Sequence, residues 1–249
     1  MTNTIQNMSN NTNRNTIFTA DDILYEDNHL IAINKRTGQL VQSDADGEKG
    51  LEDVVKAFIK HRDKKPGDVF LGVVHRIDRP VSGVVLFAKT SKALTRLNDM
   101  MRDRSIRKIY WAITDNVPEE HEGTLHHWIT RDGKTNKAHA YTSQRGDAKE
   151  AILHYRLLGG SRTYRLLEIE LITGRHHQIR CQLAKVGCPI KGDLKYGAPR
   201  SNPGGGISLH SRNIEFIHPV RKEQIIITAP TPTDDNLWSF FEASQEANA

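Results

Sequence analysis

Residues 75–83 read His-Arg-Ile-Asp-Arg-Pro-Val-Ser-Gly and connect two short apolar runs, residues 70–74 and 84–88. Short apolar runs bounded by polar and turn-forming residues are typical of buried strands. The connection places several charged side chains between these strands, and its proline and glycine are typical of a tight backbone path. The sequence therefore predicts two strands joined by a fixed, charged connection.

Asp78 lies in this connection between two cations, Arg76 and Arg79. Flanking cations favour the ionised form of a carboxylate, which is the form that a nucleophile requires. The alternative is a charged surface turn whose salt bridges are internal. The residues of the connection alone leave both interpretations open.

Apolar periodicity predicts further strands and helices on both sides of this connection. Strands are expected in a hairpin at 23–25 and 30–33, at 106–114, in several stretches between 123 and 173, and at 207–216 and 224–228; helices are expected at 50–60, 91–103, 175–186 and 236–243. Strands and helices do not alternate regularly along the chain. This order favours an α+β fold with a largely antiparallel sheet.

The domain organisation follows from composition along the 249 residues. Residues 1–16 are rich in Asn and Thr and poor in apolar residues, so we expect a disordered polar tail. Residues 17–244 are expected to form a single domain, because strand patterns continue on both sides of the glycine- and proline-containing loops. Residues 245–249 are expected to form a second short tail.

Charge and hydropathy narrow the class of protein. The net charge is +5 and the calculated pI is about 9.2, which suits a polyanionic partner but also an ordinary basic protein. The mean hydropathy is −0.57, and no apolar run reaches about 18 residues, so no membrane span is expected. With only two cysteines and no apolar signal segment, a cytoplasmic location is predicted.

The twelve histidines raise the question of a metal site. No His-x-x-x-His or His-Glu-x-x-His pattern occurs in the sequence. In the adjacent pairs 126–127 and 176–177, neighbouring side chains are expected to point in different directions, as they do on a helix or a strand. No metal site is therefore predicted.

A second unusual segment, residues 173–180, reads Thr-Gly-Arg-His-His-Gln-Ile-Arg. Arg175 falls in the first turn of the predicted helix, where a cation opposes the helix dipole but where basic and amide donors suit a phosphate group. Arg180 lies deeper in that helix and is expected to face the core side, where it requires a carboxylate partner. The alternative is an arginine whose charged end reaches solvent.

Both segments resemble signatures of the RluA family of pseudouridine synthases. The family patterns are H-R-L-D-x-x-T-S-G, T-G-R-x-H-Q-I-R, G-x-P-I-x-G-D-x-x-Y-G and K-x-Y-x-A, and they are matched by residues 75–83, 173–180, 187–197 and 108–112. A first motif is matched between residues 24 and 38. The matches follow the family's order and span residues 24–229. Three positions depart from the family pattern: Arg36, Ile77 and Val81, the last of which lacks the hydroxyl of the usual threonine.

The resemblance implies a mixed, mainly antiparallel sheet flanked by helices, with a basic cleft across it. It also implies isomerisation of specific uridines in ribosomal or transfer RNA, without a metal, nucleotide or other cofactor. Many relatives carry an N-terminal S4 RNA-binding domain, which is not expected here, and a monomer is expected. The alternatives are a non-catalytic RNA-binding protein on the same fold and an RNA-acting hydrolase.

The resemblance also implies roles for four residues. Asp78 would be the nucleophile that attacks a flipped-out uridine, at the base or at C1′. Tyr110 would stack on the uracil and is a candidate to deprotonate C5, Arg180 would pair with Asp78, and Arg76 would fill the space that the base leaves. Alternatively, Tyr110 is a core strand residue and Arg76 is only a phosphate contact.

Overall fold

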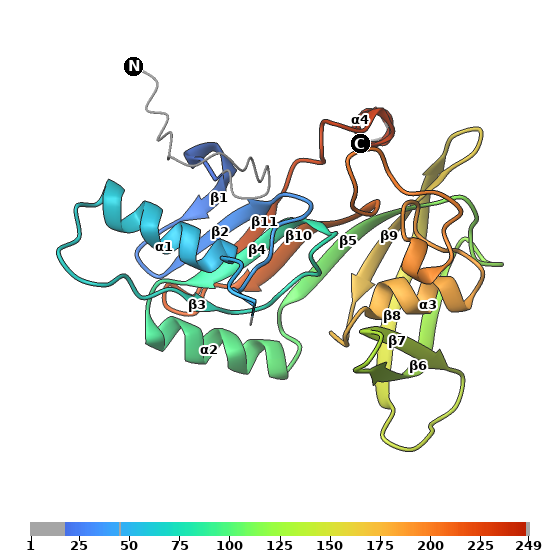
Figure 1. Ribbon diagram of the computed structural model, residues 1–249, viewed down its shortest axis with the longest axis horizontal. Coiled ribbons are helices and arrows are strands. Elements are labelled where there is room, and N and C mark those ends of the chain that lie inside the picture. Colours follow the sequence, from blue (N-terminus) through green and yellow to red (C-terminus); the bar gives the residue numbers. More distant parts are fainter. Residues whose placement is uncertain (1–17, 45, 248–249) are drawn as a thin grey trace.

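The computed structural model describes residues 18–44 and 46–247, so the predicted tail at residues 1–16 lies outside the described residues. Its centre is an eleven-stranded sheet in the order β1-β2-β4-β10-β5-β9-β8-β6-β7, with β3 attached to β4 and β11 attached to β10 (Figure 1). In chain order the elements are η2 (Ala20–Asp22), β1 (Ile23–Glu26), β2 (Leu30–Lys35), α1 (Leu51–Arg62), β3 (Gly72–Val73), β4 (Ser82–Ala88), α2 (Ser91–Arg102), β5 (Arg107–Thr114), β6 (Glu122–Asp132), β7 (Lys137–Tyr141), β8 (Lys149–Gly160), β9 (Arg165–Leu171), α3 (Gln178–Lys185), η3 (Leu194–Tyr196), β10 (Leu209–Ile217), β11 (Gln224–Thr228) and α4 (Asn236–Glu246).

The sheet is mixed but mainly antiparallel. Among the described strands, β4 and β10 pair in parallel and the other strand pairs are antiparallel. Helices lie beside both halves of the sheet, α1 and α2 near β1, β2 and β4, and α3 near β6, β7 and β8 (Figure 1). The predicted α+β class, with a mainly antiparallel mixed sheet flanked by helices, is confirmed.

The half of the sheet that contains β2 and β4 is buried on both faces. Side chains alternate along a strand, so consecutive residues of β2 reach opposite faces. Ile31 and Ile33 belong to the apolar cluster that includes Leu51 of α1. Leu30 belongs to a second cluster, which includes Leu97 of α2. The two helices thus cover opposite faces of these strands and fix the position of the connection that enters β4.

In the other half of the sheet, α3 packs against β6 and β7, and α4 packs near β5. Gln182 of α3 is fully buried and donates hydrogen bonds to the carbonyls of Leu125 and Ala151. Trp238 of α4 packs in a separate cluster with Trp111 of β5. These contacts hold α3 over β6 and β8, so the segment that leads into α3 lies beside the central strand β5.

Three expectations differ from the structure, and one of them concerns the C-terminal tail expected at residues 245–249, because α4 continues to Glu246. The strand expected at 70–74 is reduced to β3, because Phe70 is exposed and makes no ladder pairing. The helix expected from Arg175 begins only at Gln178, because His177 adopts a left-handed backbone with φ of 51°. The Gln178 side chain then accepts a hydrogen bond from the Arg175 backbone amide. The prediction that Arg175 stands in the first helical turn is therefore wrong.

The α-helices of residues 18–44 and 46–247 are short, and the longest, α1 and α2, have 12 residues each. No helix there is both long enough and apolar enough to cross a bilayer.

Candidate active site

A cavity of about 1210 Å³ opens where the 75–83 connection, the start of β5 and the segment before α3 meet. All four residues singled out from the sequence, Arg76, Asp78, Tyr110 and Arg180, line this cavity. The three chain segments that carry them are far apart in the sequence and are brought together by the order of the strands. The candidate site is therefore a single place in the fold.

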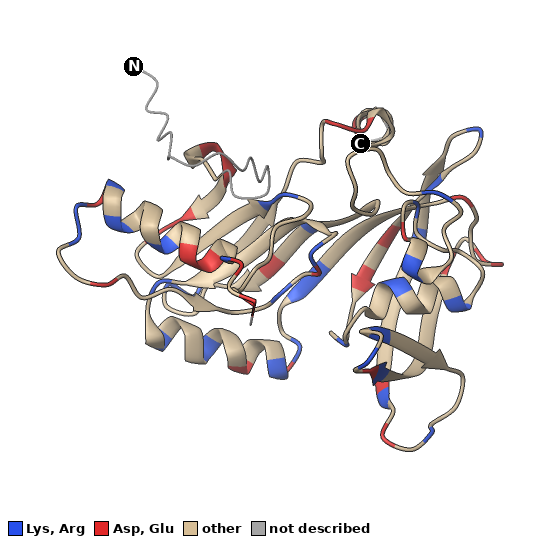
Figure 2. Ribbon diagram, in the orientation of Figure 1, with Lys and Arg blue, Asp and Glu red and all other residues tan. Residues whose placement is uncertain are grey.

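Basic side chains line two sides of the cavity. Arg102, Arg104 and Lys108 come from the end of α2 and the start of β5, and Arg131, Arg175 and Lys195 come from the other half of the sheet and its loops. Figure 2 shows basic residues at the end of α2, in β5 and in α3. Two cationic sides separated by a cavity suit a strand of nucleic acid, whose phosphates lie along its length.

The 75–83 connection is fixed by backbone contacts. The Asp78 carbonyl accepts a hydrogen bond of 3.0 Å from the Val81 amide, which closes a tight turn after the carboxylate. Gly83 has φ of 110°, and a Cβ there would lie 2.2 Å from the Ser211 carbonyl oxygen, so only glycine allows β4 and β10 to approach this closely. Asp78 is thus fixed in position shortly before β4 begins.

Lys35, at the end of β2, also contacts the backbone of the 75–83 connection. Its ammonium group donates to the carbonyls of Arg36, Gln39 and Arg79, and its side chain is almost fully buried. Burial lowers the pKa of Lys35 to about 7, although the charge of Asp78 opposes this shift. The three carbonyl contacts connect the end of β2 to the backbone that follows Asp78.

Arg180 is the cation that contacts Asp78. Its Nη1 lies 3.1 Å from Asp78 Oδ2, while its Nε and Nη2 donate to the two carboxylate oxygens of Asp193 at 2.7 and 2.9 Å. Arg180 and Asp193 are buried, at 5% and 1% exposure. Burial alone would lower the pKa of Arg180, but Asp193 and Asp78 together raise it. The guanidinium stays charged and is shared by two carboxylates.

The arginines on either side of Asp78 in the sequence, Arg76 and Arg79, form their hydrogen bonds with other residues. Arg79 donates to the Gly38 carbonyl and forms an ion pair of 3.0 Å with Glu48, and Arg76 donates to the side chain of Gln42 at 3.3 Å. The expectation that the flanking cations hold the carboxylate is therefore wrong. In a tight turn, successive side chains diverge, so the counter-charge for Asp78 comes from α3.

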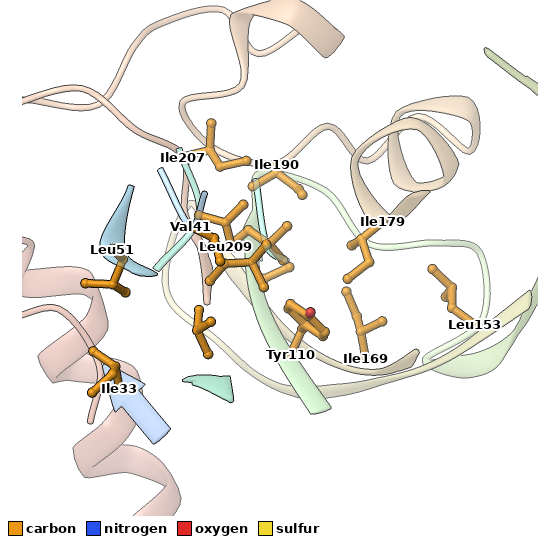
Figure 3. Close-up of a cluster of buried hydrophobic side chains, with 14 of the residues drawn as sticks. Ile33, Val41, Leu51, Tyr110, Leu153, Ile169, Ile179, Ile190, Ile207 and Leu209 are labelled. Atoms are coloured by element: carbon orange, nitrogen blue, oxygen red, sulfur yellow. The ribbon is translucent and has the colours of Figure 1, made fainter. Parts of the chain in front are cut away.

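Tyr110 occupies the middle of β5, where it pairs with Ser211 of β10 and Ile169 of β9. Figure 3 shows its ring beside Ile169 in the main apolar cluster, and its exposure is only 6%. Burial raises the pKa of Tyr110 to about 12; a hydrogen bond with Ser211 opposes this shift, and the charge of Asp78 adds to it. The ring is a core residue and also a wall of the cavity, with a neutral phenol at neutral pH.

His177 makes a second contact to Asp78 and is itself held by Tyr196. His177 Nε2 lies 3.6 Å from Asp78 Oδ2, and its Nδ1 shares a hydrogen bond of 2.9 Å with the Tyr196 hydroxyl. Burial and then the charge of Arg180 lower the pKa of His177 to about 3. The imidazole is therefore neutral at neutral pH, so this contact adds no positive charge beside Asp78.

The sequence led us to expect that the side chains of His176 and His177 point in different directions, and this prediction is wrong. Their rings stack with centroids 3.8 Å apart and an angle of 23° between the planes. The left-handed backbone of His177 is the cause, because it belongs to neither helix nor strand and turns the ring back onto its neighbour. One ligand atom from each histidine and one from Asp78 lie within 4.8 Å of one another, close enough to hold a metal ion after small adjustments.

Arg175 also departs from its expected position. Its Nε donates to the Glu150 carbonyl of β8 at 2.8 Å, and it lies before α3, although it still lines the cavity. The segment holds its shape through Thr173, whose hydroxyl contacts the Gln178 side chain at 2.8 Å. The helix N-terminus and Arg175 are therefore separate features of the cavity wall.

Sequence reasoning assigned no role to Lys35, His177, Asp193 or Tyr196, although all four stand in the motifs quoted above. What could have pointed to Lys35 and Asp193 is that each is a charged residue in or beside an apolar segment. Lys35 ends an apolar strand, and Asp193 follows Gly192 soon after the apolar Ile190. A charged side chain that becomes buried there requires a polar partner, but the partner's identity cannot be read from the chain.

A family model described as RNA pseudouridylate synthase matches residues 29–185. The chain is 36% identical over 217 residues to an uncharacterized RNA pseudouridine synthase of Synechocystis and 37% identical over 227 residues to the ribosomal large subunit pseudouridine synthase D of Xylella fastidiosa. The matches cover 85% and 86% of this chain, but only 65% and 66% of those two relatives.

The fold is also similar to a solved structure. The human protein called RNA pseudouridylate synthase domain containing 4 superposes with a TM-score of 0.73 at 25% sequence identity. The superposition covers 89% of this chain and 92% of that one. The likeness therefore extends to nearly the whole of both chains.

Proposed function

The chain belongs to the RNA pseudouridylate synthase family, and from this premise we propose that it isomerises uridine to pseudouridine in RNA, with Asp78 as the nucleophile. The observation that carries the proposal is the contact of Asp78 with the shared guanidinium of Arg180, inside a cavity lined by cations. A carboxylate that is accessible and held in one orientation by a cation has the properties of a nucleophile.

In the proposed reaction, a carboxylate oxygen of Asp78 forms a bond to the uridine, at the base or at C1′. The bond between N1 and C1′ breaks, the uracil turns in the cavity, and C5 bonds to C1′. If the carboxylate oxygen is on C1′, its bond breaks as C5 bonds there; if it is on the base, that bond breaks afterwards. C5 gives its proton to water and N1 takes one up from water, so one proton moves from C5 to N1 overall. No electrons are gained or lost overall, so the reaction requires no redox partner.

The target base must leave its stack to reach Asp78, which costs a few kcal/mol. Tyr110 lines the cavity and offers an aromatic surface to the uracil. Stacking of a base on an aromatic side chain contributes about 1–3 kcal/mol, which offsets part of that cost. Arg76 reaches the cavity from the exposed side of the same connection and is proposed to contact the RNA where the base has left.

We propose that the Tyr110 hydroxyl stays protonated during the reaction. Its raised pKa disfavours the phenolate that would be needed to remove the C5 proton. Tyr110→Phe retains the ring and loses the hydrogen bond with Ser211. We expect kcat to fall by about tenfold, the effect of one buried hydrogen bond. A single-turnover rate equal to that of the native chain would leave the hydroxyl without a chemical role.

We propose ribosomal RNA as the substrate class, since the Xylella fastidiosa relative is named a ribosomal large subunit synthase. Residues 17–244 are proposed to form one catalytic domain that acts as a monomer. The basic sides of the cavity supply phosphate contacts, which give affinity without sequence preference.

Pseudouridine mapping of total cellular RNA tests the proposal. A strain that lacks the protein is complemented with the native chain or with Asp78→Asn, which keeps the shape of the side chain and removes its charge. We expect the native chain alone to restore one or a few pseudouridines. Restoration by Asp78→Asn would contradict the assignment of the nucleophile, and RNA binding without any product from the native chain would favour a non-catalytic role.

A further inference from the structure

Two imidazole rings face the Asp78 carboxylate, and the proposed reaction uses neither as an acid or a base. His177 Nδ1 is occupied by the Tyr196 hydroxyl, so its Nε2 is the nitrogen turned towards Asp78 Oδ2, at 3.6 Å. The His176 ring stacks on that of His177. Three ligand atoms of metal-binding type, two nitrogens and one oxygen, therefore lie within 4.8 Å of one another.

His176 adds an independent observation. The His176 side chain is half-buried and its ring interacts with the Asn136 backbone, but its Nε2 is buried and has no hydrogen-bond partner among the described residues. A buried polar atom without a partner is uncommon in folded proteins and calls for an explanation, such as a bound ion. His176 also occupies the position that is left free in the pattern T-G-R-x-H-Q-I-R, so the second imidazole is a feature of this chain.

We propose that Asp78, His176 and His177 bind a zinc-type divalent cation that reversibly blocks the carboxylate. Zinc–nitrogen and zinc–oxygen bonds of about 2.0–2.2 Å place tetrahedral ligands about 3.4 Å apart. His177 Nε2 and Asp78 Oδ2 are already close to that separation. His176 must approach by up to about 1.4 Å, the difference between 4.8 and about 3.4 Å, and tilt out of the ring stack, which its position in a loop allows.

The fourth ligand is a water molecule from the cavity. Asp78 and the two histidines all line this cavity of about 1210 Å³, so the ion is open on one side. Three protein ligands with one open position are typical of an accessible zinc site. Imidazole nitrogen selects zinc-type ions over Mg²⁺ and Ca²⁺, which prefer sites made of oxygen ligands.

Cations lie near the two imidazoles as well, namely Arg131, Arg180 and Lys195, so the ion is bound through the three ligand atoms and not through the net charge of the cavity. Asp78 and Asp193 share the guanidinium of Arg180. Arg180 is held by Asp193 through Nε and Nη2, and only its Nη1 reaches Asp78. Arg180 therefore retains a buried partner when Asp78 turns to the ion.

Metal binding is measured first, without reference to activity. The full chain is titrated with Co²⁺, followed by its visible absorption, and with Zn²⁺ in competition with a chelating indicator. The variants His176→Gln and His176→Asn remove one ligand, and His126→Gln is the matched control, an exposed histidine on β6 beside Glu150. We expect one tight equivalent in the native chain and in His126→Gln, with affinity at least tenfold weaker in both His176 variants.

Inhibition is measured second, and this arm alone rests on the proposed function. Zn²⁺ should suppress pseudouridine formation by the native chain, EDTA should restore it, and Mg²⁺ at the same concentration should have no effect. For each variant, the rate is compared with its own metal-free rate. The His176 variants should require at least tenfold more Zn²⁺ for half inhibition, whereas His126→Gln should respond like the native chain.

Several results would overturn the inference. Equal Zn²⁺ affinity of the native chain and both His176 variants, with melting curves that show all three folded, would exclude His176 as a ligand. Tight binding that leaves the rate unchanged would contradict the block of Asp78. A native chain that binds Zn²⁺ as expected but never forms pseudouridine would contradict the proposed function and leave the metal site supported by the absorption and competition data.

Discussion

The 75–83 connection and the 173–197 segment meet at one carboxylate, but they contribute in different ways. The first supplies Asp78 on a backbone fixed by a tight turn, while its own Arg76 and Arg79 bond elsewhere. The second lies about a hundred residues later and supplies the contacts to that carboxylate, through Arg180 and His177. Charges that are neighbours in the chain are therefore not partners in the site.

The reason for this difference is burial. Arg76 and Arg79 lie on the exposed side of the connection, where water competes for their charge. Arg180 is 5% exposed and must be paired, and Asp193 and Asp78 are the carboxylates within reach. An exposed arginine can bond to many groups, whereas a buried one defines its partners.

Acid should destabilise both segments. Burial lowers the pKa of His75 to about 4 and that of His177 to about 3, from a model-peptide value of 6.5. A lowered folded pKa means that the folded state binds fewer protons, so this stability is fully present above pH 6.5 and is lost as pH falls below it. We expect a loss of at most about 2 kcal/mol per histidine between pH 6.5 and 5.

Urea denaturation at pH 7.5 and pH 5.0 measures this loss. Carboxylates contribute little in this range because they titrate mainly at lower pH. His75→Gln and His177→Gln should each reduce the difference between the two pH values. An unfolding free energy that is the same at pH 7.5 and 5.0 would show that neither histidine is held neutral by burial.

Arg180→Lys tests the shared cation. Lysine keeps the charge, but its single ammonium group cannot hold two carboxylates with the geometry of a guanidinium. We expect kcat to fall by about thirtyfold, equivalent to about 2 kcal/mol for a charge-assisted hydrogen bond. Steady-state kinetics on a substrate RNA measures the change, and a kcat within twofold of native would mean that the contact between Arg180 and Asp78 does not support the reaction.

Asp193→Asn tests whether the ion pair between Asp193 and Arg180 is needed to orient the guanidinium towards Asp78. The amide has nearly the same shape but lacks the charge, and one of its two positions donates instead of accepting. We expect kcat to fall by about tenfold with little change in KM, because Arg180 becomes less firmly oriented while the RNA contacts remain. A change in KM alone would place Asp193 in RNA binding rather than in the support of Arg180.

Arg79→Lys is the matched control for Arg180→Lys and should have the smallest effect. Arg79 pairs with Glu48 at a partly exposed site, and such ion pairs contribute about 0–1 kcal/mol. We expect kcat and the melting temperature to stay close to those of the native chain. A loss of kcat as large as that of Arg180→Lys would reverse the comparison between the two segments.

Much of this protein could be predicted from its sequence alone. The α+β class and most strands and helices follow from apolar periodicity, because a buried strand or helix needs apolar residues at fixed intervals. The 75–83 and 173–180 segments could be recognised because they place charged residues where the pattern of a core would not. Their resemblance to one family then gave a single proposed reaction.

Only the tertiary structure decided the contacts within the site. The sequence placed Asp78 between two arginines, but the fold turned both aside and brought Arg180 to it. It also stacked His176 on His177, because one left-handed residue replaced the first turn of a predicted helix. Local periodicity depends on neighbours a few residues apart, whereas an ion pair or a ring stack depends on where distant strands and helices place their side chains.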